Sequence, residues 1–208
     1  MTLGEMITRV RRELKDESSV LWSDDELTRH IDRAVAELSE AIPLEQKATI
    51  ATTADSRQVD ISSLSDRVMV EAVEYPVDEF TKIYQRFALW ADTLTLLGSE
   101  IPDGSDCYLY YGRLHTLDAV TSTVPAKCED MVAAGAAGYA ALAWGVYAVN
   151  RVNVGGAATP REYCIWGEER LRFFSQEVKK LGRKSRVRTC SLYKPAYPPV
   201  SKTTDYGP

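Results

Sequence analysis

Apolar residues recur every three or four positions near the start of the chain, which predicts two amphipathic helices. The first stripe consists of Leu3, Met6, Ile7, Val10 and Leu14, and the second of Leu27, Ile31, Ala34, Val35, Leu38 and Ile42. A capping box, in which an N-cap Ser or Thr pairs with a Glu three residues later, opens each helix at Thr2–Glu5 and Ser23–Glu26. We therefore expect one helix to end near Asp16 and the other at Pro43.

Between Glu45 and Thr116 the period of the pattern changes to two, which predicts β-strands. The expected strands are 49–52, 58–61, 67–75, 87–90, 93–97 and 107–111. Residues 91–92 and 102–104 have the composition of turns, and the first of these turns joins two strands in a hairpin. The sequence therefore predicts a small antiparallel β domain between helical segments.

A third helix is expected from Pro125 to about Val149. Proline suits the first helical position, and the acidic Glu129 and Asp130 suit the positive end of the helix dipole. The uncharged stretch 131–149 is long enough to span a membrane. Eleven of its nineteen residues are Ala or Gly, which gain little on transfer into hydrocarbon. We therefore expect an interior or subunit-interface helix and no membrane contact.

The last helix is expected to open with a third capping box, Thr159–Glu162, after a Gly-containing break at 152–158. Gly182 has the position of a natural C-cap, so we expect the helix to end there. The following segment, 183–208, is basic, rich in proline and without periodicity. It predicts an extended arm that becomes ordered only against a partner.

Together these elements predict an α+β fold, in which a four-helix bundle has an antiparallel β domain inserted between helices 2 and 3 and an extended C-terminal arm. The expected parts are an N-terminal helical pair (1–44), the β insertion (45–118), a C-terminal helical pair that completes the bundle (119–182) and the basic arm (183–208).

The 208 residues, 45% apolar and 26% charged, have the composition of an ordinary globular protein that buries a core without metal or disulfide support. The net charge of −5 is unevenly distributed. From Lys179 onward eight basic residues face one acidic residue, a net charge of +7, which leaves −12 for the rest of the chain. An acidic body with a basic tail is therefore the main electrostatic feature.

The third helix is unusually rich in small residues. Glycine inside a helix costs about 0.8–1 kcal/mol relative to alanine, a cost that close approach of a neighbouring backbone would offset. Two interpretations remain open: close packing within one subunit, or packing that also involves a neighbouring subunit. The candidate subunit-packing residues are Ala134, Gly135, Gly138, Ala141 and Gly145.

Catalytic chemistry has little support in the sequence. None of the common nucleophile, phosphate-loop, zinc-protease or dinucleotide motifs occurs. The four cysteines are widely separated, and the two histidines are expected on an exposed helix face (His30) and at a strand end (His115). We therefore expect a non-enzymatic protein without catalytic residues, metal or cofactor.

The arm admits three interpretations. Its dense basic residues could neutralise phosphates of nucleic acid. The tyrosines and prolines between them favour an extended peptide that docks on a protein partner. Simple disorder is the third. A nucleic-acid-binding protein that acts through the basic arm is accordingly the alternative function.

The order of motifs resembles the head-to-tail adaptor, or connector, proteins of tailed bacteriophages. The opening LGEMITRVRREL and WSDDELTRHIDRAVAELSEAIP resemble the start of that family. The resemblance continues through the β insertion, through VPAKCEDMVAAGAAGYAALAW, and to the final helix with its RVRTCSLYKP arm. The order of these elements carries more weight than any one of them, since a Trp-Ser-Asp-x-Glu-Leu segment is also a stapled capping box.

This resemblance implies a virion protein of the neck, assembled in the host cytoplasm, that forms a homo-oligomeric ring of twelve subunits below the portal protein. DNA would pass through the lumen without sequence-specific binding, and tail or nozzle proteins would bind the opposite face. The arm would clamp the portal. The candidate portal-binding residues are Arg183, Arg186, Arg188, Leu192, Tyr193, Pro195 and Tyr197.

Overall fold

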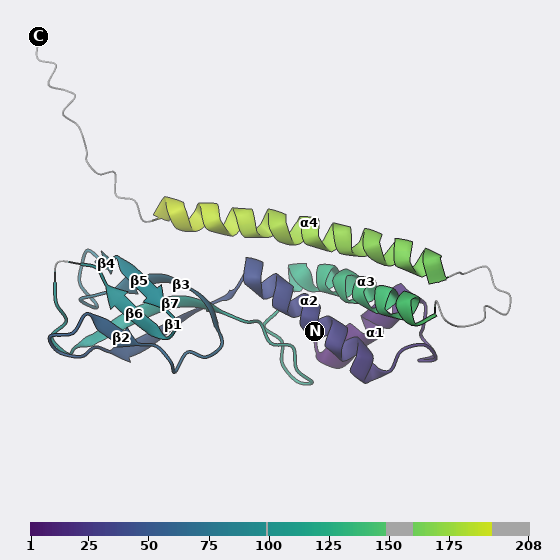
Figure 1. Cartoon of the computed structure of the whole chain (residues 1–208), viewed down its shortest axis with the longest axis horizontal. Coiled ribbons are helices and arrows are strands. Elements are labelled where there is room, and N and C mark those ends of the chain that lie inside the picture. The colour runs from purple at the N-terminus through teal and green to yellow at the C-terminus, as the bar shows by residue number, and fades with distance from the viewer. Residues whose placement is uncertain (99, 149–159, 193–208) are drawn as a thin grey trace, which may run out of the picture.

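The computed structural model describes residues 1–98, 100–148 and 160–192. The molecule is elongated, with a helical domain at one end and a β domain at the other (Figure 1). The helices are α1 (Leu3–Leu14), α2 (Asp24–Ala41), α3 (Glu129–Ala148), which follows the short 3-10 helix η1 (Ala126–Cys128), and α4 (Pro160–Leu192). The strands are β1 (Leu44–Ala51), β2 (Gln58–Asp60), β3 (Arg67–Glu74), β4 (Tyr84–Gln85), β5 (Phe87–Trp90), β6 (Thr93–Leu96) and β7 (Asp106–Arg113). The predicted α+β class is confirmed.

The apolar stripes of α1 and α2 form one core with α3 and α4. The capping boxes predicted for α1 and α2 are present: the Glu5 carboxylate accepts from the Thr2 N–H at 2.7 Å, and Glu26 accepts from the Ser23 N–H at 2.9 Å. Thr159 of the third predicted capping box lies outside the described residues. The helix α3 is central, because it packs against each of the other three. Its two ends differ in polarity, since acidic residues occupy only the first turn.

The β domain consists of two antiparallel sheets, with strand orders β1-β7-β3-β4 and β2-β6-β5. The predicted hairpin is confirmed, with Phe87 opposite Leu96 and Trp90 opposite Thr93. The edge strand β1 is longer than predicted, because it begins at Leu44 and pairs with β7 along its whole length. Side chains from both sheets share a second core, separate from that of the helices.

The two domains are joined around a buried histidine. The backbone N–H of His115, just after β7, donates to the Ser39 hydroxyl of α2 at 2.9 Å. The imidazole lies 3.0 Å from the Ile42 carbonyl oxygen and 3.2 Å from the Thr123 hydroxyl. These contacts connect the end of α2 to the chain that leaves the β domain. His115, which was predicted at a strand end, therefore also holds the two domains together.

The C-terminal boundary of the last helix was predicted wrongly. The sequence placed the end of the helix at Gly182 and an extended arm from 183, but α4 continues to Leu192. Gly182 lies against Ala41, and an added Cβ would come 3.3 Å from the Ala41 carbonyl oxygen, so the glycine allows close packing and is not a C-cap. The residues that follow include several good helix formers and no proline before Pro195. The rest of the predicted arm, 193–208, lies outside the described residues.

Among the described residues, one helical segment, Ala126–Ala148, is long and apolar enough to cross a membrane, with a mean hydropathy of 1.3. Length and composition alone support that assignment, and 67% of its most apolar window is buried inside the fold. A core helix passes the same test, and α3 is covered by α1, α2 and α4.

Candidate functional site

The long contact between α3 and α4 depends on glycines in both helices. An added Cβ at Gly135 would meet the Phe174 ring at 2.9 Å, and one at Gly138 would lie 3.0 Å from the Gly167 carbonyl oxygen. At Gly145, an added Cβ would meet the Cys164 side chain. The glycines therefore permit the close backbone approach that their sequence pattern predicts.

All five candidate subunit-packing residues are buried within the single chain: Ala134, Gly135, Gly138, Ala141 and Gly145. Their close neighbours on α4 account for the three glycines without a second subunit. Of the two interpretations left open by the sequence, the structure therefore shows the packing within one subunit. Contact of these positions with a neighbouring subunit stays a prediction.

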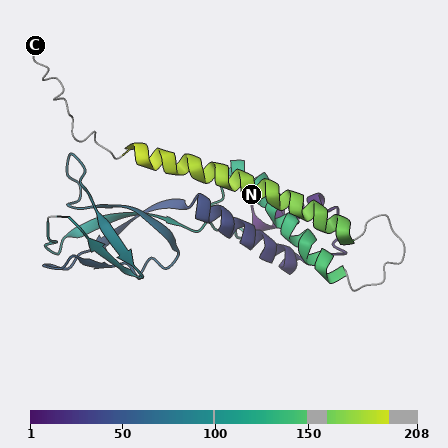
Figure 2. The same ribbon diagram turned by 45° about the horizontal axis from the view of Figure 1, so that its top comes forward.

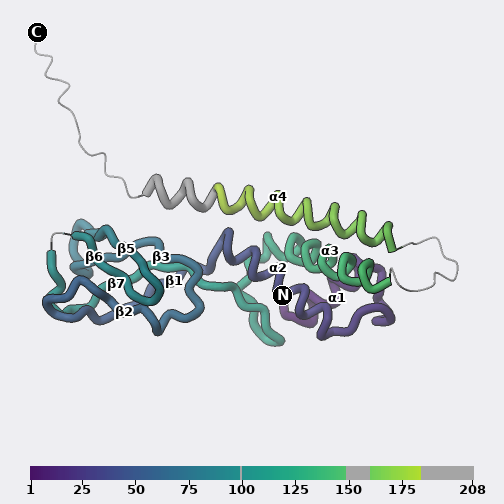
Figure 3. The backbone as a smooth tube through the Cα atoms, in the orientation of Figure 1, coloured from purple at the N-terminus to yellow at the C-terminus, as the bar shows by residue number. Residues whose placement is uncertain are grey.

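The C-terminal part of α4 extends past the rest of the helical domain. At 33 residues α4 is about 50 Å long, whereas the 20 residues of α3 span about 30 Å. Gly182 contacts the last residue of α2, and the ten positions after it continue as helix toward the side of the β domain (Figures 1 and 2). The tube in Figure 3 shows the preceding part of α4 lying along α3.

This overhang, defined here as residues 183–192, includes four of the candidate portal-binding residues: Arg183, Arg186, Arg188 and Leu192. Arg183 is exposed. Three further candidates, Tyr193, Pro195 and Tyr197, lie outside the described residues. The structure thus places the first four on one projecting helix, which the sequence had predicted as extended chain.

A second projecting feature is the β3–β4 loop, residues 75–83, which presents Phe80 fully to solvent. The loop is held by the carboxylate of Glu74, which is completely buried. That carboxylate accepts hydrogen bonds from the Tyr110 hydroxyl at 2.6 Å and the Lys82 ammonium at 2.9 Å. The backbone N–H of Asp78 donates to it at 3.3 Å.

Two opposing effects act on Glu74. Burial disfavours its charge, but the hydrogen bonds from Tyr110, Lys82 and the Asp78 backbone outweigh burial and hold the pKa below its ordinary value. The carboxylate is therefore ionised at neutral pH and is paired within the fold. The loop therefore holds the exposed Phe80 ring on a fixed backbone.

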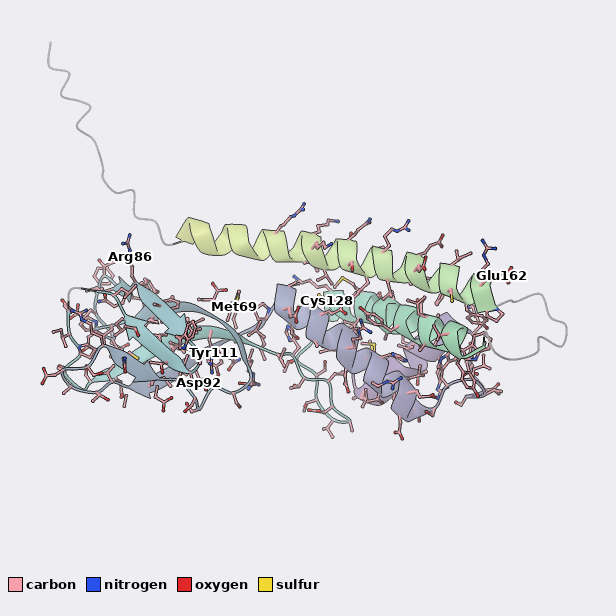
Figure 4. The ribbon with its side chains drawn as sticks, in the orientation of Figure 1. Met69, Arg86, Asp92, Tyr111, Cys128 and Glu162 are labelled. Atoms are coloured by element: carbon pink, nitrogen blue, oxygen red, sulfur yellow. The ribbon has the colours of Figure 1, made fainter. Side chains whose placement is uncertain are left out.

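At the β5–β6 turn another aromatic residue, Trp90, is 86% exposed. The Arg67 guanidinium holds this turn, because it donates to the Ala91 carbonyl at 2.8 Å and to the Asp92 carboxylate at 2.6 Å. Asp92 is labelled in Figure 4, on the β domain. The sequence identified the turn but gave no signal that Trp90 would be exposed, because aromatic residues in strands are usually buried.

The histidines do not form a catalytic site. His30 was predicted on an exposed face, but it is buried, and burial followed by the nearby Arg29 and Arg33 charges lowers its pKa. In residues 1–98, 100–148 and 160–192 no group of three or more His, Cys, Asp and Glu side chains could hold a metal ion.

A model of the family described as SU10 adaptor protein matches residues 1–176. The match spans both the helical domain and the β domain, and confirms the resemblance to phage head–tail adaptors that the sequence motifs indicated. No curated protein matches the chain.

Proposed function

The chain belongs to the SU10 adaptor protein family of phage head–tail adaptors, and we propose that it is a structural subunit of a ring below the portal. In this proposal about twelve copies join the portal to the tail and line the channel through which the DNA passes. The protein is a virion component that associates with other head and tail proteins. Its position in the neck and its assembly in the host cytoplasm are part of the proposal.

The overhang of α4 is the observation that carries the portal contact. Beyond the contact of Gly182 with Ala41 the helix continues for ten residues, and Arg183, the first of them, is exposed. Its basic sequence contrasts with the acidic body, so an acidic surface on the portal would attract it. We propose that residues 183–192 and the residues that follow bind the portal.

The charge of the body supports the channel role. DNA that slides through a lumen must not adhere to it, and the net charge of −12 before Lys179 disfavours phosphate contacts. The alternative function is nucleic-acid binding through the basic C-terminal residues. It is supported by the same contrast between an acidic body and a basic C-terminal segment. The two functions differ in whether the basic segment meets protein or DNA.

We propose the anchored loop with Phe80 as a further contact for the portal, because it joins β3 and β4 in the domain toward which the overhang of α4 runs. Its exposed ring supplies apolar area, and the Glu74 hydrogen bonds fix the loop before binding, which reduces the entropy that binding must remove. Aromatic side chains are enriched among the residues that dominate protein interfaces.

Light scattering of the purified chain mixed with its candidate portal tests the proposal. The full chain is expected to form a complex of large, defined mass, and a chain that ends at Gly182 is expected to lose it. A chain that ends at Leu192 separates the overhang from residues 193–208. Circular dichroism of each truncation shows that the helical domain is folded.

The opposite result is also specific. A full-length chain that stays monomeric with portal, but retains DNA with an affinity that falls steeply as salt increases, would favour the nucleic-acid-binding alternative.

A further inference from the structure

A groove separates α1 from α4 at the end of the molecule away from the β domain. It has a volume of about 620 Å³ and is lined by Arg9, Arg12, Glu13, Leu14, Lys15, Glu162, Tyr163, Trp166 and Arg170. Glu162, labelled in Figure 4, marks its position at the N-terminal end of α4. Most of the exposed wall is apolar, with Tyr163 and Trp166 as its largest side chains.

The rim of the groove is positive on an otherwise acidic body. Arg9 pairs with Asp130, and Arg170 pairs with Glu13 at 3.2 Å. Arg12 and Lys15 are exposed at the rim. An occupant that combines an apolar tip with acidic side chains would complement both the wall and the rim.

Nucleic acid fits this groove poorly. The Tyr163 ring already packs on Trp144, with ring centroids 4.5 Å apart, and on Trp22 at 6.3 Å. Its face is therefore engaged within the protein and is not free to stack on a base. A protein segment is the favoured occupant.

The chain itself carries such a segment in the α1–α2 loop, residues 16–25. Val20 is 78% exposed and Leu21 40% exposed at its tip. Glu17 and Asp25 flank this apolar pair and are exposed. The loop thus has the apolar tip and the acidic flanks that the groove requires.

The loop is rigid as well as exposed. The buried carboxylate of Asp16 accepts hydrogen bonds from the backbone N–H groups of Val20 at 2.8 Å and Trp22 at 3.1 Å. The buried Arg11 side chain donates to Asp16, to the Trp22 carbonyl at 2.9 Å and to Asp24 at 2.7 Å. An apolar tip held in one conformation loses little entropy on binding.

The groove and the loop are two different surfaces that border each other at Arg12, which lines both the groove and the cavity beside the loop. The groove uses Arg9 and Glu13, which are four residues apart and so share one face of the helix. The cavity beside the loop uses Gly4, Thr8 and Arg11, which lie on the opposite face. A chain with two different, complementary surfaces joins head to tail, and such contacts form a ring where the rotation from one copy to the next closes.

We propose that the α1–α4 groove of one chain receives the α1–α2 loop of a second copy. Val20 and Leu21 would contact the apolar wall, while Glu17 and Asp25 would face Arg12 and Lys15. This contact rests on the proposed ring and supplies its subunit interface. It involves none of the residues assigned to the portal contact.

Charge reversal on each side tests the contact. The groove variant R12E/K15E and the loop variant E17K/D25K are each expected to self-associate at least about tenfold more weakly than the unmodified chain, because like charges then face each other. A mixture of the two variants is expected to recover association, since each groove again meets a loop of opposite charge. The control R172E/K180E changes two exposed charges of α4 outside the groove and is expected to behave as the unmodified chain.

The masses are measured by light scattering, alone and with portal, and circular dichroism verifies folding. The contact would be overturned if the folded groove or loop variants kept full self-association, or if their mixture failed to recover it. The portal proposal would stay intact in either case. An unmodified chain that remains monomeric in both conditions would overturn both. Loss of salt-sensitive DNA binding in R12E/K15E, with unchanged self-association, would identify the groove as a phosphate site instead.

Discussion

The helical domain and the β domain are stabilised by different means. In the helical domain the small residues of α3 let α4 approach so closely that Phe174 and Leu171 lie directly over glycines. In the β domain buried polar groups fix the loops: Glu74 holds one, and the Tyr75 hydroxyl, which donates to Asp103 at 2.9 Å, holds another. Close packing of two helices thus distinguishes the first domain, whose α1–α2 loop is also held by the buried Asp16 and Arg11. In the second domain hydrogen bonds fix the loops that carry exposed aromatic residues.

This difference matches two tasks. A close-packed helical frame resists deformation, which suits the part of an adaptor that bears load between a portal and a tail. Anchored loops leave Phe80 and Trp90 exposed, which suits a domain that contacts partners. The following substitutions test whether close packing stabilises the helical domain and whether hydrogen bonds fix the loops of the β domain.

The largest effect is expected from Phe174→Ala in the helical core. The ring is completely buried against Gly135, so its removal leaves a cavity and should lower the free energy of unfolding by about 3–5 kcal/mol. The adjacent Phe173, which is half exposed, provides the control: Phe173→Ala should cost far less. Urea denaturation measures both, and equal losses would contradict the account of the α3–α4 contact.

Next in size is Glu74→Gln, which removes the charge that anchors the β3–β4 loop. We expect a loss of about 1–3 kcal/mol at neutral pH, because Lys82 and Tyr110 lose a charged partner. Glu71→Gln, at an exposed position of the same strand, is the control. Thermal unfolding of both variants beside the unmodified chain gives the comparison.

The pH dependence of that loss has a defined sign. The pKa of Glu74 is lowered in the folded state, so its contribution is complete above the ordinary value of 4.5 and disappears as the pH falls through the folded pKa. The stability gap between the unmodified chain and Glu74→Gln should therefore narrow in acid. A gap that widened below pH 4.5 would show that the carboxylate is not held ionised by the fold.

Two glycine substitutions should have opposite signs. Gly138→Ala places a Cβ 3.0 Å from the Gly167 carbonyl, and we expect a loss of about 1–3 kcal/mol despite the better helix propensity of alanine. Gly4→Ala in α1 meets no atom within 4 Å and should gain up to about 1 kcal/mol. Chemical denaturation of both variants checks the signs, and a stabilised Gly138→Ala would refute the close-packing explanation.

The smallest effect on stability is expected at the exposed aromatic residues. Phe80→Ala and Trp90→Ala should each change the free energy of unfolding by no more than about 0.5 kcal/mol. The proposal assigns a portal contact to the loop of Phe80, so Phe80→Ala should weaken binding to the purified portal, as measured by interferometry. Binding that is lost only in Trp90→Ala would move the contact to the β5–β6 turn.

Local sequence signals predicted the fold where neighbouring residues determine the structure. The capping boxes at Thr2 and Ser23 and the hairpin turn at Ala91 are examples, because their partners are within a few positions. The helix end at Gly182 was missed because the glycine responds to Ala41, which is distant in sequence. Burial of His30 was missed for a similar reason, since packing by other elements, and not its own helix stripe, decides its exposure.

The contact surfaces were even less accessible to sequence reasoning. Arg12 and Lys15 appear as ordinary charges at the end of α1, and only their position across from α4 makes them the rim of a groove. Likewise, exposure of Phe80 depends on a loop that Glu74, Lys82 and Tyr110 hold from three different segments. Such sites follow from tertiary structure.

Electron microscopy of the portal mixed with the full-length chain tests the central claim most directly. The account predicts class averages in which a ring of added density is stacked on one face of the portal, and in which this ring is absent when the chain ends at Gly182. Portal particles without added density, or with the chain bound at scattered positions, would contradict the assignment of this protein as a ring subunit that joins the portal to the tail.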